Sequence, residues 1–157
     1  VRELLFKALQ EKNITSPFGE RIYISRKKAA RKKFTDENLA DKVLTQYGFD
    51  SVCMEDYSFF EQIAIMRKAK CLITITGAGT INAFFMNEDA HLIDLPHKDY
   101  ITKSQYKFHF YKLCNILGIR YSALFLERED NPDVWHYSLQ NLYFDEKKIT
   151  EYLDANL

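Results

Sequence analysis

Cysteine, glycine and proline are all scarce in this chain of 157 residues, which contains three cysteines, five glycines and three prolines. The cysteines at positions 53, 71 and 114 fall within apolar segments and show no CxxC spacing, which argues against a disulfide framework or a cysteine metal site. The four histidines form no ligand pattern either, and we expect no bound metal. No internal repeat or low-complexity linker interrupts the sequence.

Net charge and long hydrophobic runs are also absent. The 22 basic and 22 acidic side chains balance, which argues against a general nucleic-acid binder. No window approaches the roughly 18 uninterrupted apolar residues of a membrane span, and the N-terminal residues form an amphipathic helix pattern rather than a signal peptide. We therefore expect a cytoplasmic protein without a membrane span. Peripheral attachment to the inner membrane is the alternative.

What the sequence does contain is an alternation of short apolar, β-branched segments with helix patterns, over the length of one domain. This alternation predicts βαβ crossovers and a parallel sheet with helices on both faces. We therefore expect a single α/β, Rossmann-like domain of three layers over residues 1–157, with about five parallel strands. The expected strands are 21–25, 49–54, 71–76, 91–96 and 121–126, and the expected helices are 4–10, 35–47, one from 59 onward, 81–86, 102–117 and one after 145.

Helix ends and inward faces are also predicted. Thr35 and Asp145 are the expected N-caps of the second and last helices, and Ser58 with Glu61 forms a capping box. Phe59, Ile63 and Met66 are expected to face inward from the helix that this box opens, with Phe60 left open. Five residues are expected to face inward from the helix 102–117: Tyr106, Phe110, Leu113, Cys114 and Leu117.

The stretch CLITITGAGTIN, residues 71–82, combines a buried-strand pattern with two glycines that break it before a helix. Glycines at such a turn permit positive φ and allow a ligand to approach backbone N–H groups at the helix N-terminus. The turn formed by Gly77, Ala78 and Gly79 therefore predicts a cradle for an anion or a nucleotide. A tight turn without a ligand is an equally simple interpretation.

A second unusual segment follows the first strand, where seven basic residues occur without an acidic one between positions 21 and 33. A GxGxxG fingerprint is missing here, which disfavours ordinary NAD binding. Arg26, directly after the strand, and Arg31 are the expected phosphate ligands, while Lys27, Lys28, Lys32 and Lys33 are expected to be solvated. A wholly solvated basic loop is the alternative, and the lack of interleaved aromatic residues disfavours RNA binding.

Further polar residues end other strands or follow the glycine turn. Glu55 and Asp94 follow or end the second and fourth strands, where a carboxylate can accept hydrogen bonds from ribose hydroxyls. Thr80 and Asn82 can cap the short helix or donate to a ligand.

Taken together, these segments closely resemble the C-terminal part of glycosyltransferase family 61, which is found in capsular polysaccharide biosynthesis proteins and in eukaryotic protein O-glycosylation enzymes. The resemblance covers about residues 21–96, from IYISRKKAARKKFTDE through EDYSFFEQ to TGAGTIN and LIDLP. The positions that match the motifs of the family are Ser25, Arg26, Arg31, Glu55, 58–62, 77–82, Asp94 and Pro96.

The resemblance implies a GT-B fold, of which this chain would be the C-terminal, donor-binding half. A nucleotide sugar, most often a UDP sugar, would be the donor substrate, with no other cofactor, and a glycan of a capsular or surface polysaccharide the acceptor. Transfer would be metal-independent and would invert the configuration at the sugar carbon. The implied diphosphate ligands are Arg26, Arg31, Gly77, Ala78, Gly79, Thr80 and Asn82, and the implied nucleoside or sugar ligands are Thr76, Glu55 and Asp94.

Two departures from the family pattern matter. The histidine that precedes GAG in the family is Thr76 here, which removes a group expected to contact the donor. The chain is also too short for both GT-B halves, so we expect the acceptor site and the general base on an N-terminal half or a partner subunit, and no catalytic residue is assigned. A binding module for a nucleotide or phosphosugar, without chemistry, is the alternative function.

Overall fold

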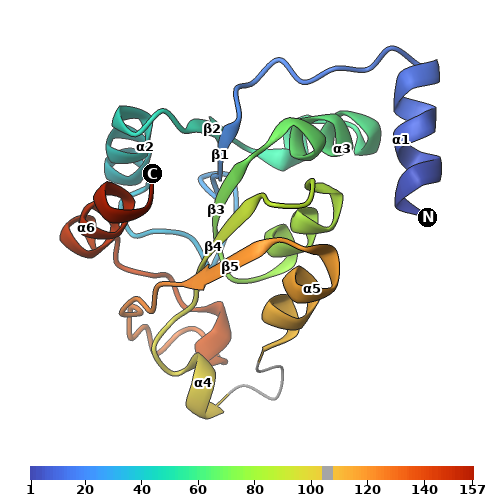
Figure 1. Cartoon of the computed structure of the whole chain (residues 1–157). Helices are drawn as coiled ribbons and strands as arrows, with labels where there is room; N and C mark the ends of the chain where they lie inside the picture. Colours follow the sequence, from blue (N-terminus) through green and yellow to red (C-terminus); the bar gives the residue numbers. More distant parts are fainter. Residues whose placement is uncertain (104–107) are drawn as a thin grey trace.

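A computed structural model describes residues 1–103 and 108–157, and this part of the chain contains a single five-stranded sheet. The strands are β1 (Arg21–Ile24), β2 (Asp50–Val52), β3 (Cys71–Ile75), β4 (His91–Leu95) and β5 (Arg120–Ala123). Their order is β2-β1-β3-β4-β5, and every neighbouring pair is parallel. The predicted α/β, Rossmann-like fold with a parallel sheet is confirmed (Figure 1).

Helices cover both faces of this sheet, which gives three layers (Figure 1). One face packs against α3 (Phe59–Lys68), α5 (His109–Leu117) and the 3₁₀ helix η2 (Ala78–Phe85). The other face packs against α2 (Glu37–Gln46) and α6 (Glu146–Asn156). The remaining described helices are α1 (Arg2–Glu11), which packs against α3 from outside, α4 (Tyr100–Lys103), η1 (Met54–Asp56) and η3 (Tyr137–Leu139).

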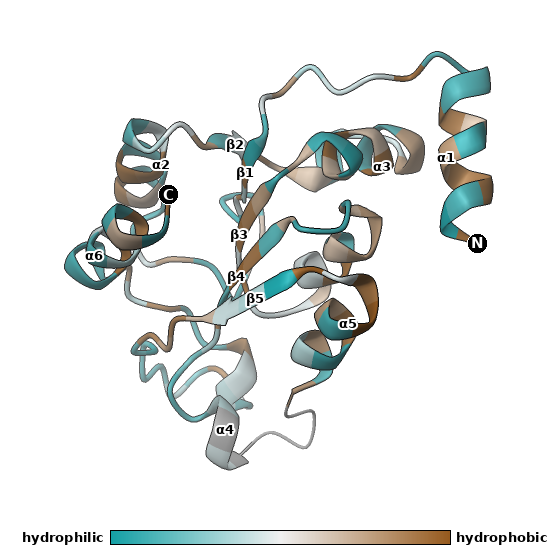
Figure 2. Ribbon diagram, viewed as in Figure 1, coloured by the Kyte–Doolittle hydropathy of each residue, from teal (hydrophilic) through white to brown (hydrophobic). Residues whose placement is uncertain are grey.

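The strands are apolar on both faces because both faces are covered. Along β3, Leu72 joins the cluster under α3 and α5, whereas Ile73 and Ile75 join the cluster under α2 and α6. All five residues of β3 are buried, as expected for a central parallel strand. The helices instead alternate hydrophilic and hydrophobic bands along their length (Figure 2), because only one side of each packs on the core.

Helix starts follow the sequence with one correction. The capping box is confirmed, since the Ser58 N–H donates to the Glu61 carboxylate at 2.8 Å, and Asp145 caps α6 by accepting from the Lys148 N–H at 3.0 Å. The cap predicted at Thr35 is wrong, because Asp36 accepts from the Leu39 N–H at 2.9 Å. Thr35 and Asp36 are adjacent and both are good N-cap residues, so the sequence pattern could not decide between them.

The helix predicted over 102–117 does not run as one element. Helix α4 ends at Lys103 and α5 begins at His109, after Phe108 takes a left-handed backbone conformation with φ of +67°. Cys114 and Leu117 are buried as predicted, whereas Phe110 and Leu113 are only partly buried, and Tyr106 lies outside the described residues. The inward orientation predicted for Phe59 is also wrong, because its side chain is 55% exposed.

The strand order brings the ends of β1 and β3 together at the edge where ligands bind in open α/β sheets. β1 lies between β2 and β3, so the direction of strand addition reverses there. Ile24 pairs with both Val52 and Thr74, and Thr74 pairs with Asp94. Arg26 and Thr76 therefore leave two adjacent strands at the same level.

Metal sites and membrane-spanning helices are the two features considered next. Within residues 1–103 and 108–157, no three or more His, Cys, Asp or Glu side chains gather in a way that could hold a metal ion. None of the helices in this described part is both long and apolar enough to cross a membrane.

Candidate functional site

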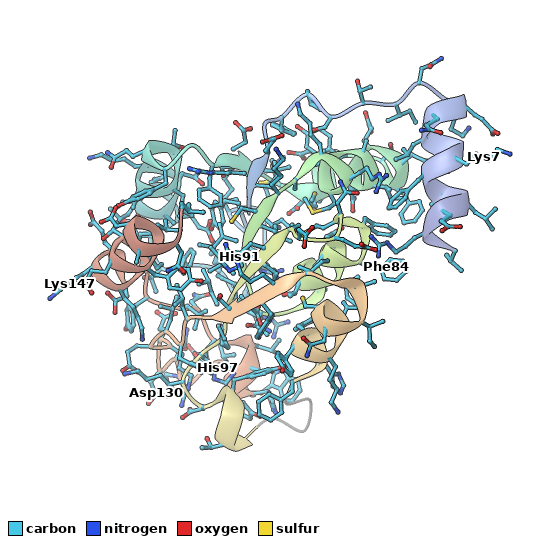
Figure 3. The ribbon with its side chains drawn as sticks, in the orientation of Figure 1. Lys7, Phe84, His91, His97, Asp130 and Lys147 are labelled. Atoms are coloured by element: carbon cyan, nitrogen blue, oxygen red, sulfur yellow. The ribbon has the colours of Figure 1, made fainter. Side chains whose placement is uncertain are left out.

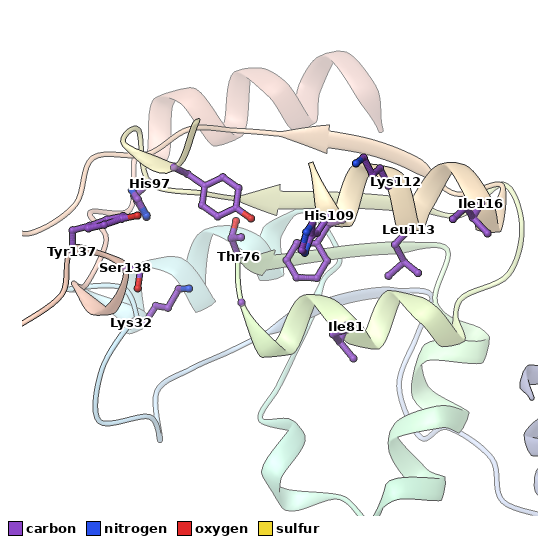
Figure 4. Close-up of a pocket in the computed structure, with 13 residues that line it drawn as sticks. Lys32, Thr76, Ile81, His97, His109, Lys112, Leu113, Ile116, Tyr137 and Ser138 are labelled. Carbon is purple, nitrogen blue, oxygen red and sulfur yellow. The ribbon is translucent and has the colours of Figure 1, made fainter. Parts of the chain in front are cut away.

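A pocket of about 610 Å³ opens at the carboxyl edge of the sheet, beside the ends of β3 and β4 (Figure 4). Thr76 and Gly77 line it from the turn after β3, and Lys32 reaches it from the loop after β1. The remaining walls come from η2, η3, the segment after β4, and α5. Thr76 and Lys32 lie toward one end of the pocket, and Ile81, Leu113 and Ile116 lie toward the other (Figure 4). His109 and Lys112 of α5 also line this second end.

Hydrogen bonds fix the glycine turn at the floor of this pocket. The Gly77 N–H donates to Thr80 Oγ1 at 3.0 Å, and the Thr80 hydroxyl lies 3.5 Å from Asp94 Oδ1. The Asn82 side chain donates to the Gly79 carbonyl oxygen at 3.0 Å. Thr80 and Asn82 therefore both act as local caps of the turn, one of the two alternatives left open by the sequence.

Asp94 is the buried acceptor beneath this turn. It accepts hydrogen bonds from the Thr76 hydroxyl at 2.8 Å and from the Tyr121 hydroxyl at 2.9 Å, and none of its surface is exposed. Burial raises the pKa of the Asp94 carboxyl to about 6, although the hydrogen bonds from Thr76 and Tyr121 oppose this shift. Because the Thr76 hydroxyl donates its hydrogen bond to Asp94, the Thr76 oxygen can still accept a hydrogen bond from a ligand.

Close packing, rather than positive φ, explains the second glycine of the turn. Gly77 has φ of 162°, which is extended backbone, and neither Gly77 nor Gly79 is among the glycines with positive φ. The turn therefore does not use the positive φ that its glycines permit. A Cβ added to Gly79 would lie 3.3 Å from Thr74 Oγ1, which is a tight contact, and 3.5 Å from Ile24 Cγ2, so glycine lets η2 pack closely on β1 and β3.

The basic loop after β1 is held from within by the first of its arginines. Arg26 Nε donates to the Lys32 carbonyl oxygen at 2.6 Å, and its Nη2 lies 3.4 Å from the Arg31 carbonyl oxygen. The side chain of Arg31 is exposed, and neither arginine lines the pocket. The predicted contact of Arg26 and Arg31 with a phosphate stays a prediction.

Glu37 anchors the same loop on the sheet. Its Oε2 accepts from the Tyr23 hydroxyl at 2.8 Å and from Ser25 Oγ at 2.9 Å, and its Oε1 accepts from the Phe34 N–H at 2.9 Å. Burial and the neighbouring Glu37 carboxylate raise the pKa of Tyr23, so this phenol stays a donor. One carboxylate thus joins the end of β1, the end of the basic loop and the start of α2.

Lys32 departs most from its predicted solvated state. It is only partly exposed, and its Nζ lies 3.2 Å from the position that a Cβ on Gly77 would take. Burial lowers the pKa of Lys32, the positive charge of Arg26 lowers it further, and Asp94 opposes both effects. Lys28 is exposed, as predicted, and its Nζ forms a 2.5 Å ion pair with Asp56. Its exposed position makes that pair energetically minor.

The predicted site residues thus separate into three groups. Thr76 and Gly77 line the pocket, whereas Asp94 and Thr80 lie buried beneath it and Ala78 is exposed. Glu55 is exposed in η1 at the end of β2 and is not among the residues that line the pocket.

Sequence reasoning missed several residues that line the pocket, among them His97 and Ser138. His97 follows β4 at the opposite end from His91 (Figure 3), and its ring lies 5.9 Å from the Tyr100 ring and 5.3 Å from the Tyr137 ring. Ser138 comes from η3, next to Tyr137. The position of His97 after a strand was a usable signal, but nothing in the sequence around η3 indicated that this segment folds back over β3 and β4.

A family model described as Glycosyltransferase 61 matches residues 1–93, which is more than half of the chain and includes β1, β2, β3 and the start of β4. A search of curated proteins found no match.

Proposed function

This chain belongs to glycosyltransferase family 61, and on that premise we propose that it is the donor-binding domain of a sugar transferase. The proposed donor is a nucleotide sugar, most often a UDP sugar, and the proposed acceptor is a glycan of a capsular or surface polysaccharide. The observation that carries the proposal is the pocket at the carboxyl edge of β1, β3 and β4, where the strand order reverses.

The two ends of the pocket match the two ends of such a donor. Lys32 offers a cation for a diphosphate, and the Thr76 oxygen offers a hydrogen-bond acceptor for a sugar hydroxyl. Ile81, Leu113 and Ile116 offer an apolar surface that suits the flat face of a nucleobase. A volume of about 610 Å³ lies within the range of small-molecule sites.

The proposed chemistry needs positive charge at the leaving group. As the bond between the sugar carbon and the diphosphate breaks, charge develops on the diphosphate, and fixed donors stabilise it without a metal ion. We assign the diphosphate to the pocket end near Lys32 and the glycine turn, with Arg26 and Arg31 on the loop behind it. The acceptor and its general base are proposed to lie on an N-terminal GT-B half or a partner subunit.

Thr76 favours one alternative function, a binding module without transfer. Its hydroxyl donates to a fully buried carboxylate, so it cannot also donate a proton to the donor. A module of this kind would hold a nucleotide or phosphosugar and leave the sugar in place.

A titration followed by an activity assay separates these readings. The purified chain is titrated calorimetrically with UDP and a panel of UDP sugars, and is then incubated with the same sugars and candidate glycans while glycoside and free UDP are measured by mass spectrometry. We expect saturable binding of UDP and no steady glycoside formation by this chain alone, because the proximity of an acceptor can be worth about 7–11 kcal/mol of barrier. Glycoside formation on addition of the N-terminal half would support the transferase, and binding alone would support the module.

A blocked pocket provides the control. Gly77→Val adds a side chain where the Lys32 ammonium now lies, so it should abolish UDP binding. Ala155→Val adds methyl groups on an exposed part of α6 and should leave binding unchanged. Equal UDP affinity of Gly77→Val and the wild type would show that the nucleotide binds elsewhere.

A further inference from the structure

The backbone of Lys32 is held in an unusual conformation beside the pocket. Its φ is +57°, in the left-handed region that a lysine rarely adopts. Arg26 Nε donates to its carbonyl oxygen at 2.6 Å, and the N–H of Lys33 donates to Asn141 Oδ1 at 3.3 Å. A strained backbone that is fixed from two sides and carries its side chain into a pocket is a reason to assign that side chain a role.

The surroundings of the Lys32 ammonium favour an anion. Nζ lies 3.2 Å from the place of a Cβ on Gly77, so it points at the glycine turn and shares the pocket with Thr76 and Ser138 (Figure 4). The negative charge that influences it is the buried Asp94, which already accepts hydrogen bonds from the Thr76 and Tyr121 hydroxyls. A partly desolvated ammonium of this kind gains more from a phosphate than a fully hydrated one does.

Arg26 is placed differently, although it follows β1 directly. Its guanidinium is directed at the carbonyl oxygens of Lys32 and Arg31, and it is not among the residues that line the pocket. The planar fork suits this task, because it can reach two carbonyl oxygens of one loop at once. Its influence on a ligand therefore passes through the loop.

We propose that Lys32 contacts the phosphate of the ligand in this pocket, and that Arg26 is a positioning residue that holds the Lys32 backbone. This assignment rests on the proposed function, since it names the side chain that receives the diphosphate. The sequence had instead predicted Arg26 as a phosphate ligand and Lys32 as a solvated side chain.

Calorimetric titrations with UDP, uridine and inorganic pyrophosphate test the role of Lys32. Lys32→Gln should weaken UDP and pyrophosphate binding about 10- to 100-fold, the usual range for a charge-assisted hydrogen bond. Uridine affinity should not change, because uridine has no phosphate. Lys32→Arg should restore most of the UDP affinity, and Lys27→Gln, the same change at a side chain that is 49% exposed, should have little effect.

The pH dependence of UDP affinity is a second test, because a purely structural role of Lys32 would not change it. Because the pKa of Lys32 is lowered, UDP affinity of the wild type should begin to fall at a lower pH than an ordinary lysine would give. The fall should disappear in Lys32→Arg, since arginine keeps its charge. In Arg26→Gln the fall in UDP affinity should move to higher pH, because a neighbouring positive charge has been removed. UDP affinity at pH 7 should decrease in the same variant, because the hydrogen bond from Arg26 to the Lys32 carbonyl oxygen is lost.

Each outcome bears on a different claim. Pyrophosphate binding that depends on Lys32, without any UDP binding, would overturn the nucleotide-sugar proposal and leave the Lys32 assignment standing. UDP binding that is equal in Lys32→Gln and the wild type would overturn the assignment and leave the proposed function intact. A wild type that binds neither probe would overturn both.

Discussion

At the scale of single residues, the two glycines of the turn make different demands. A Cβ on Gly79 would make a tight contact with Thr74 Oγ1 at 3.3 Å, on a strand whose residues are all buried. A Cβ on Gly77 would meet only the far end of the flexible Lys32 side chain. The two positions therefore differ in stability cost even though both follow one strand.

Replacement by alanine tests this difference. Gly79→Ala should lower the free energy of unfolding by about 1–3 kcal/mol, the usual cost of overpacking a core. Gly77→Ala should cost much less in stability, because the lysine can shift. Urea unfolding of both variants measures the difference, and equal losses would show that the close contacts at Gly79 do not limit the fold.

Glu37 is the second residue with a clear expected effect. In Glu37→Gln one carboxylate oxygen becomes an NH₂ group, so at least one of the donors Tyr23, Ser25 and Phe34 loses its acceptor. Leaving a buried donor unpaired should cost about 1–3 kcal/mol. Urea unfolding checks this, with Glu11→Gln at an exposed end of α1 as the matched control. A loss no larger than that of the control would argue against Glu37 as the anchor.

Residue-level prediction from sequence succeeded where one pattern had one physical solution. The capping box of Ser58 and Glu61 is such a case, because both side chains satisfy each other within one turn. Lys32 could not be predicted, since its orientation depends on a left-handed backbone and on contacts of the loop with Arg26 and Asn141. Neighbouring lysines in a basic run look alike until the backbone path is known.

At the scale of elements, β4 carries a titratable group near each end. His91 at its start has Nδ1 2.8 Å from Arg120 Nη2 and Nε2 2.9 Å from Ser122 Oγ, and burial followed by the charge of Arg120 lowers its pKa to about 4. Asp94, near the end of β4, pairs with Thr74 of β3, and burial raises the pKa of its carboxyl to about 6. The two shifts have opposite consequences for stability.

The signs follow from which state binds the proton first. As pH falls from about 6.5 to 4, the unfolded chain protonates His91 before the folded chain does, so stability decreases. As pH falls from about 6 to 3.8, the folded chain protonates Asp94 first, so stability increases. The two contributions largely cancel over the same window.

Removing the histidine should expose the other contribution. The difference in free energy of unfolding between His91→Gln and the wild type should shift by about 2 kcal/mol in favour of the variant from pH 7 to pH 5. This shift does not depend on how stable the variant is at pH 7. Urea unfolding at both pH values measures this difference. Asp94→Asn should show the opposite trend, with a steeper loss on acidification than the wild type, and parallel pH profiles for all three proteins would contradict the assignment.

Elements were predictable from sequence where periodicity and length agreed. The five strands were found because their apolar runs are short and are separated by helix patterns. The break between α4 and α5 was missed, since the residues on both sides fit one helical face and the left-handed Phe108 leaves no mark in the sequence. The extent of η2 was also missed, because a 3₁₀ helix has no strong periodic pattern.

At the scale of the whole molecule, α1 forms a separate apolar cluster with α3. Leu9 is buried in this cluster, Arg67 lies over the Phe6 ring at 4.0 Å, and Arg2 donates to the Met86 carbonyl oxygen at 2.5 Å. None of these residues lines the pocket at the carboxyl edge. Stability and ligand binding should therefore be separable at this end of the molecule.

Truncation of Leu9 tests that separation. Leu9→Ala should lower the free energy of unfolding by about 2 kcal/mol or more, because it leaves a cavity between α1 and α3. UDP affinity measured well below the unfolding transition should not change. Leu4→Ala is the matched control, since this leucine is 73% exposed. A loss of UDP affinity in Leu9→Ala would show that the helix cluster and the pocket are coupled.

The strand order also decides when a growing chain can complete its sheet. β1 is made first, and its first partner is β2, whose three residues pair with Ile22, Tyr23 and Ile24. A pair of strands is marginally stable in water, and β1 gains its second neighbour only when β3 has been made. Because every described pair is parallel, each needs a long crossover, and loop closure precedes every sheet contact. A ribosome-bound chain that stops before residue 71 therefore leaves one edge of β1 open, and chaperone capture should be strongest over that interval.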